Sequence, residues 1–250
     1  MTWNSVMGFV SSFALFLPIA LILALRLHNY KSFPALVVYY SSVFIYNLMT
    51  EGYIPMSKQI VYNWGLINNL LDAPLMMLFL TYFSPSLLFT KRLKIAVAAY
   101  ILFEIVVIAL RGLNVESITI ILGPGIIMIA ALCLHFFVRH AKMAVEHGKS
   151  TGKALIAGSL LFAYGCFGLI YLMYYVFKTP HVADTFLVYF MAATVSALMM
   201  SAGIIYERKL VKKIKEVQIT RRELSEIYKD TKMAAPVRTA MLDFDKESWN

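Results

Sequence analysis

Residues Ile118–Val138 read ITIILGPGIIMIAALCLHFFV, a run without Asp, Glu, Lys or Arg. A helix of this length, at about 1.5 Å per residue, matches the ~30 Å hydrocarbon core of a bilayer. Six further apolar stretches accompany it along the chain: Val6–Leu25, Ala35–Met49, Val61–Phe83, Ile95–Leu110, Ala154–Phe177 and Thr185–Tyr206. The pattern predicts an integral membrane protein with seven transmembrane helices.

The composition of the whole chain points the same way. Hydrophobic residues make up 60% of it and charged residues only 15%, whereas a soluble domain is charged at about a quarter of its positions. The apolar residues fall in blocks rather than alternating, which favours helices over a membrane β-barrel. A helix also pairs its backbone polar groups within one segment, as lipid demands. We therefore expect an all-α, multi-pass bundle in a plasma membrane or bacterial inner membrane.

The basic residues predict the orientation of the bundle. If the N-terminus lies outside, only Lys58, Arg111 and Lys178 of the 23 Lys and Arg residues are external. The other twenty then face the cytoplasm, as the positive-inside rule requires. The C-terminus is accordingly predicted to be cytoplasmic. The net charge of +9 is explained by topology, and no nucleic-acid partner is needed.

Three segments are predicted along the chain. Residues 1–206 form the seven-helix domain, residues 207–232 a cytoplasmic amphipathic helix, and residues 233–250 a disordered tail. The middle segment has a heptad-like pattern, with Glu207 on its polar side and the following residues in the core slots: Leu210, Ile214, Val217, Arg221, Leu224 and Tyr228. This helix either extends the seventh span and pairs with a second copy, or lies on the membrane with its lysines on anionic lipid. A homo-oligomer is expected.

Two carboxylates lie inside the predicted spans. Asp72 is the midpoint of Val61–Phe83, and Glu104 is near the middle of Ile95–Leu110. A charged Asp at this depth costs about 2.5–3.5 kcal/mol on insertion scales, so such residues normally face the bundle interior. No Lys or Arg in a span neutralises them. We expect each to be protonated, hydrogen-bonded to amides or hydroxyls, or in contact with water.

Amides near Asp72 extend this polar centre. Asn68 and Asn69 precede Asp72 by four and three residues and share its helical face, and Asn47 lies at membrane depth in the second stretch. Together with Glu104, these residues form the predicted site for a small ligand or a proton. In the alternative interpretation they only join helices, at about 0.6 kcal/mol per hydrogen bond.

Other residues predict bends and close packing. Kinks are expected at Pro18, at Pro74 and at Gly123-Pro124-Gly125, because proline removes a backbone donor. In transporters, broken helices of this kind often mark a binding site. Close helix packing is expected along a stripe of small residues in the last span: Ala193, Ala197 and Ser201.

Motifs for enzymatic chemistry are missing from the sequence. It contains no G-x-S-x-G element, no P-loop and no Cys–His pairing. The spacings of His135, His140 and His147 do not place two ligands on one helical face, so no metal site is predicted. We expect no cofactor, and the sequence favours a protein that is not an enzyme.

Two short stretches of the chain resemble microbial rhodopsins, but the residue at the position of their retinal lysine differs. Asp72-Ala73-Pro74-Leu75-Met76-Met77 is similar to their Thr-x-Pro-Leu-Leu stretch, and Thr194-Val195-Ser196-Ala197 is similar to the residues before their retinal lysine. At the position of that lysine this chain has Leu198. The resemblance therefore implies no retinal Schiff base here.

These observations lead to three functional hypotheses. The first is a sensor or receptor-like protein that binds a small molecule, a lipid or a proton near Asp72 and signals to a cytoplasmic protein through its C-terminal helix. The second is a proton- or cation-coupled transporter or channel that uses Asp72 and Glu104. The third is an intramembrane lipid-modifying enzyme, because carboxyl groups can also perform acid–base chemistry.

Overall fold

The computed structural model describes residues 3–84, 86–148, 150–173, 177 and 182–227, with the backbone alone at 3–5, 182–186, 215 and 227. The described residues form an all-helical protein, and seven of its helices are long and apolar enough to cross a membrane. The expected all-α fold, with seven helices long and apolar enough to span a membrane, is thereby confirmed. The elements are α1 (Trp3–Ala24), α2 (Phe33–Thr50), α3 (Lys58–Leu80), the 3-10 helix η1 (Thr81–Phe83), α4 (Leu87–Arg111), α5 (Val115–His147), α6 (Thr151–Tyr171) and α7 (Val182–Ile227).

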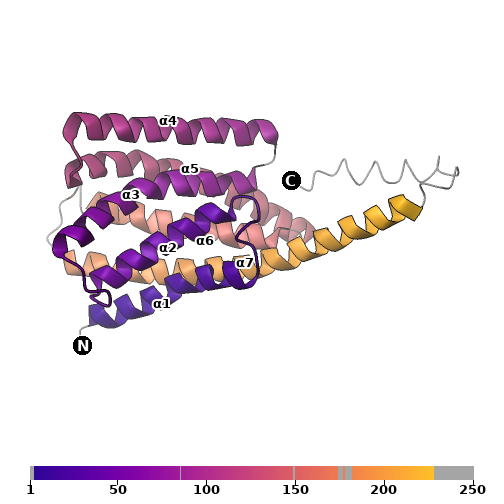
Figure 1. Cartoon of the computed structure of the whole chain (residues 1–250), viewed down its shortest axis with the longest axis horizontal. Coiled ribbons are helices and arrows are strands. Elements are labelled where there is room, and N and C mark those ends of the chain that lie inside the picture. Colours follow the sequence, from indigo (N-terminus) through magenta and orange to yellow (C-terminus); the bar gives the residue numbers. More distant parts are fainter. Residues whose placement is uncertain (1–2, 85, 149, 174–176, 178–181, 228–250) are drawn as a thin grey trace.

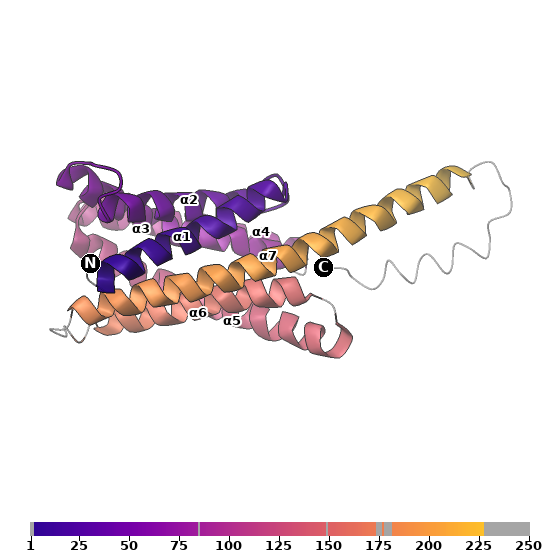
Figure 2. The same cartoon turned by 90° about the horizontal axis from the view of Figure 1, so that it is seen from below.

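Six of the seven helices close a ring. In the order α1, α2, α3, α5, α6 and α7 each helix contacts the next, and α7 returns to contact α1. Helix α4 lies outside this ring, against α3 and α5 (Figure 1). Helix α7 continues well beyond the end of the bundle (Figure 2). A central space between the ring helices is therefore bordered by six of them.

One end of the bundle collects most of the basic residues, and we call it the basic end. It comprises the α1–α2, α3–α4 and α5–α6 connections and the part of α7 that projects from the bundle. Its described basic residues include Arg26, Lys31, Lys91, Arg92, Arg139, Lys153 and Lys212. The predicted cytoplasmic orientation of this end rests on that charge asymmetry.

Local sequence signals define where several helices begin and end. The side chains of Ser57, Ser86 and Asn114 accept hydrogen bonds from the first turns of α3, α4 and α5, which satisfies N–H groups that have no partner within the helix. Helices α4 and α5 end at Gly112 and Gly148, whose φ angles are 78° and 62°. Glycine adopts these angles without steric cost.

Two helices are longer than the apolar runs predict. Helix α5 reaches His147, so the predicted internal loop 139–153 is mostly helical, and only residues 148–150 separate α5 from α6. The charged residues of this segment suggested a loop, but they lie on the exposed surface of a helix. Lys142 and Glu146 pair there one turn apart, with 3.7 Å between Nζ and Oε1. Helix α7 is likewise continuous across Glu207. The predicted tail 233–250 and Tyr228 lie outside the described residues.

The core and the outer surface are both apolar. Four phenylalanine rings near the basic end pack one against the next, with centroids 5.5–5.8 Å apart: Phe33 of α2, Phe79 of α3, Phe83 of η1 and Phe136 of α5. Large apolar side chains also cover the outside of the bundle, among them Phe13, Leu102, Ile127, Leu169 and Leu198. An apolar surface of this extent fits a lipid environment.

The predicted stripe of small residues on α7 is buried against other helices of the same molecule. Ala193, Ala197 and Ser201 are all buried, on a helix that packs between α1 and α6. Their small side chains therefore serve contacts within one molecule rather than an exposed surface. Pro18 and Pro74 lie inside the continuous helices α1 and α3.

Candidate functional site

Asp72 of α3 is the centre of a polar cluster between three helices. The Tyr164 hydroxyl of α6 donates a hydrogen bond to Asp72 Oδ1 at 2.5 Å. Tyr39 of α2 also interacts with this carboxyl group. Hydroxyl bonds to a carboxylate are short and about twice as strong as neutral ones. We call Asp72, Tyr39 and Tyr164 the Asp72 cluster.

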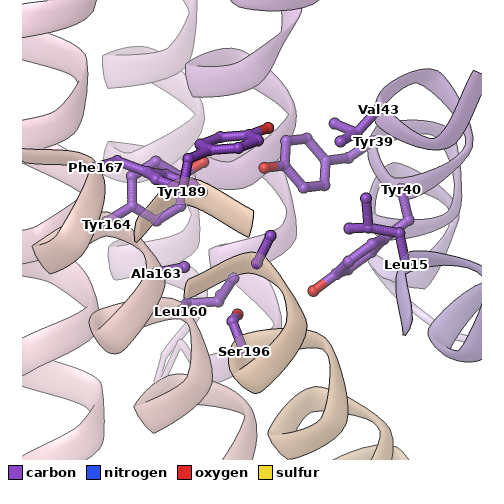
Figure 3. A pocket seen from close by; sticks show the side chains of 11 residues that line it. Leu15, Tyr39, Tyr40, Val43, Leu160, Ala163, Tyr164, Phe167, Tyr189 and Ser196 are labelled. Carbon is purple, nitrogen blue, oxygen red and sulfur yellow. The ribbon is translucent and has the colours of Figure 1, made fainter. Parts of the chain in front are cut away.

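A small cavity adjoins this cluster inside the ring. Figure 3 shows Tyr39 and Tyr164 in its wall together with Tyr189 and Ser196. Tyr40 and apolar side chains complete the lining, and the volume available to the centre of a water molecule is about 20 Å³. A cavity of 10–15 Å³ on this scale holds one water if polar partners surround it. The cavity therefore has room for about one water molecule.

Glu104 of α4 lies near this cluster but outside its hydrogen bonds. Its side chain is buried, and Oε1 has no hydrogen-bond partner among the described residues. Glu104 interacts electrostatically with Asp72. The structure thus brings the two predicted carboxyl groups into the same region, with the phenols bound to only one of them.

The predicted amides occupy different positions. Asn47 is buried between α2 and α1, where Nδ2 donates to Ser12 Oγ at 3.0 Å. Asn68 and Asn69 are half-buried, and no hydrogen bond joins either of them to Asp72 within the described chain. The i−3 and i−4 spacing sets a common helical face, but Asp72 takes its partners from other helices. Binding roles for the three amides remain predictions.

Two tyrosine side chains from neighbouring helices pack against the Gly123-Pro124-Gly125 segment. Tyr100 of α4 donates to the Ile121 carbonyl at 2.7 Å, and Tyr171 of α6 donates to the Thr119 carbonyl at 3.0 Å. The added Cβ of an alanine at position 123 or 125 would clash with Tyr171 or Tyr100, respectively. The glycines therefore create space for hydroxyl groups beside the turn that Pro124 disrupts.

A second polar cluster lies at the basic end, around Glu207 of α7. The Tyr82 hydroxyl of η1 donates to Glu207 Oε1. Glu207 is 2% exposed and Lys153 of α6 is 8% exposed, and the two interact as opposite charges. The Lys153 ammonium also lies 5.1 Å from the centre of the Tyr82 ring, where the ring face attracts a cation. We call Glu207, Tyr82, Lys153 and Lys31 the Glu207 cluster.

Lys31 completes this cluster from the α1–α2 connection. Its Nζ atom lies 5.6 Å from the Tyr82 ring centre and 5.7 Å from that of Tyr30. Lys31 also interacts electrostatically with Glu207. Burial raises the pKa of Tyr30, and the Glu207 carboxylate raises it further. Two lysines and two tyrosines thus surround one carboxylate.

Helices α6 and α7 make a close backbone contact at Glu207. A Cβ at Gly152 would lie 2.7 Å from the Glu207 backbone nitrogen and 3.0 Å from its Cα. The contact is at the start of α6, where Ser150 makes no side-chain capping bond. The carboxylate therefore sits near the partial positive charge of a helix N-terminus. Its Oε2 atom has no hydrogen-bond partner in the described structure.

The sequence prediction placed Glu207 on a polar outer face, and this was wrong. The heptad pattern treats the helix as isolated, whereas Gly152 and Tyr82 enclose this position. One signal was available, because Glu207 follows Gly203 by one helical turn and is an acid at the start of a basic segment. Tyr39 and Tyr164 had no comparable signal, since tyrosines are common throughout this chain.

No protein-family model, curated protein or solved structure matches this chain. The two clusters and the helices that carry them are therefore the features from which a function can be inferred.

Proposed function

We propose that this chain is a seven-helix membrane sensor. In this proposal a proton or small ligand acts at the Asp72 cluster, and the Glu207 cluster passes the resulting change to the projecting part of α7. The basic end faces the cytoplasm, and a separate cytoplasmic protein receives the signal. The projecting segment carries charged residues suited to such a contact, including Arg208, Lys212, Lys213, Arg222 and Glu226.

The observation that carries the proposal is that α6 contributes a residue to each cluster, and that α3 leads directly into η1, which carries Tyr82. Asp72 lies on α3, which leads into Tyr82, and Tyr164 lies on α6, which begins beside Lys153. Tyr164 and Lys153 are separated by roughly 16 Å along α6 at the usual helical rise. A change in the Asp72–Tyr164 bond therefore acts on two of the helices that enclose Glu207.

The size of the cavity bears on what the site detects. A space of about 20 Å³ accepts a water molecule, whereas pockets for small molecules are typically 300–1,000 Å³. A proton fits the cluster as it stands. A larger ligand requires a second arrangement of the ring, and it would shift the equilibrium by binding that arrangement more tightly.

Infrared difference spectra between acidic and neutral pH test the proton version directly. A protonated carboxyl group in the purified protein gives a carbonyl band that Asp72→Asn should remove and Glu104→Gln should leave. Native mass spectrometry of the same samples tests the ligand version, since a bound mass should vanish in Asp72→Asn. If Asp72→Asn removes neither the carbonyl band nor the bound mass, Asp72 is not the sensing group.

Proton or cation transport is the second candidate, and the unpaired Glu104 supports it. Its buried Oε1 atom has no hydrogen-bond partner in the part of the chain that the structure describes, and it is close enough to Asp72 for electrostatic interaction. Two carboxyl groups in one region could pass a proton between them. Transport predicts flux in liposomes that Asp72→Asn and Glu104→Gln each abolish. Undiminished flux in both variants would exclude this route.

A further inference from the structure

A surface groove on α5 is separate from both clusters. It has a volume of about 490 Å³ and is lined by Ala131, Leu134, His135, Val138 and Arg139. These positions are spaced by three and four residues, so they form one face of the helix. Leu134 and Val138 are more than half exposed. The groove therefore opens to the surroundings of the bundle.

The position of the groove along α5 places it beside lipid. The apolar run Ile118–Val138 spans about 30 Å as a helix, which matches the hydrocarbon core. Arg139 is the next residue and thus lies at the level of the lipid headgroups. The apolar lining residues lie deeper in the membrane than Arg139, at the depth of the acyl chains: Ala131, Leu134 and Val138.

The positive charge of Arg139 at the end of the groove favours lipids with an anionic headgroup. No ion pair involving Arg139 is found among the described residues, and its charged neighbours include Lys153, which is also basic. His135 stacks on Phe89 of α4 with ring centroids 6.4 Å apart, and this contact fixes its ring at the groove. An arginine at a membrane surface binds phosphate through two parallel N–H bonds.

We propose that this groove binds an anionic glycerophospholipid. One acyl chain lies along Ala131, Leu134 and Val138, and the phosphate contacts Arg139 and His135. Under the predicted orientation the groove opens to the cytoplasmic leaflet, which contains the anionic lipids. A zwitterionic lipid carries a compensating ammonium group and fits this basic site less well.

Quenching by brominated lipids tests the proposal in reconstituted protein. Trp3, Trp64 and Trp249 are replaced by Phe, and Val138→Trp places the one reporter in the groove. Dibrominated phosphatidylglycerol and dibrominated phosphatidylcholine are then compared. One basic residue near a membrane surface contributes about 1 kcal/mol, which corresponds to about a fivefold preference for the anionic lipid.

Three variants in the reporter background identify the source of that preference. Arg139→Gln should abolish it, and Arg139→Lys should retain part of it. Arg92→Gln removes an exposed basic residue of α4 outside the groove and should leave it unchanged. Equal quenching by both lipids before any change at Arg139 would overturn the proposal. If neither lipid quenches the reporter, the proposal is also overturned, because lipid then does not contact the groove.

Discussion

Tyr82 and Glu207 are 125 residues apart in the chain, yet the Tyr82 hydroxyl donates to the Glu207 carboxylate in a buried contact. The contact joins η1, which follows α3, to α7. Lys153 and Gly152 bring the start of α6 to the same carboxylate. Glu207 thus connects α7 to η1 and to the start of α6, beside the buried α7 residues Ile204 and Val211.

Loss of the Glu207 carboxylate should destabilise the protein strongly. Glu207→Ala removes the acceptor of the buried Tyr82 hydroxyl and the carboxylate that interacts with Lys153, and an unsatisfied buried polar group costs about 1–3 kcal/mol. Unfolding in mixed micelles measures the effect. The matched control is Glu216→Ala, which removes an exposed pair with Lys212 and should change stability by less than about 1 kcal/mol.

A second change should reverse much of that loss. In Glu207→Ala combined with Lys153→Met, no uncompensated charge remains in the interior, and an apolar replacement of a buried pair is often tolerated. The double variant should be more stable than Glu207→Ala alone. A double variant that is less stable would show that Lys153 has another partner more important than Glu207.

The glycines of α6 should respond in opposite ways to an added methyl group. Gly152→Ala forces the new Cβ against the Glu207 backbone, and overpacking of this kind costs about 1–3 kcal/mol. Gly165 is also on α6, and nothing lies within 4 Å of a Cβ added there. Gly165→Ala should therefore stabilise the protein by about 0.4–1 kcal/mol. Equal effects at the two positions would contradict the close α6–α7 contact.

Gly125 and Tyr100 should be energetically coupled. The Cβ in Gly125→Ala would meet the Tyr100 hydroxyl and lie 3.1 Å from Ala73 Cβ. Tyr100→Phe removes that hydroxyl at the cost of its bond to Ile121, about 1 kcal/mol. The two substitutions together should cost less than the sum of their separate effects. A strictly additive double-mutant cycle would show that the two residues do not share this space.

Tyr164 should contribute measurable stability through Asp72. Tyr164→Phe removes one of the two phenol groups that interact with the Asp72 carboxyl group, and a hydrogen bond to a charged group contributes about 1.5–3 kcal/mol. Tyr62→Phe serves as the control because Tyr62 is exposed on α3. Similar unfolding curves for both variants would mean that Tyr39 or water replaces the Tyr164 bond.

The sequence predicts the spans well because lipid limits what a spanning segment can be. An apolar run such as Ile118–Val138 has few alternatives to a helix. The same physics placed Asp72 at the centre of the bundle, since an acid at that depth must face other helices. The extent of α5 beyond the bilayer was not predicted, because outside lipid the apolar pattern no longer marks helical residues.

Partners across the bundle were beyond the reach of sequence patterns. Asp72 and Tyr164 are 92 positions apart, and helical spacing relates only residues within a few turns. Asn68 and Asn69 were predicted as partners of Asp72 instead, because they precede it by four and three residues in the sequence. The same limit hid Glu207, whose burial depends on a glycine in another helix.

We propose that the Asp72 cluster controls the position of the projecting part of α7. Spin labels at Lys142→Cys and Glu223→Cys, both exposed, report the distance from the end of α5 to that segment. The background carries Cys133→Ala and Cys166→Ser. Pulsed electron paramagnetic resonance should show a shifted distance distribution in Tyr164→Phe and an unchanged one in Tyr62→Phe. Identical distributions in the parent protein and both variants would contradict the claim.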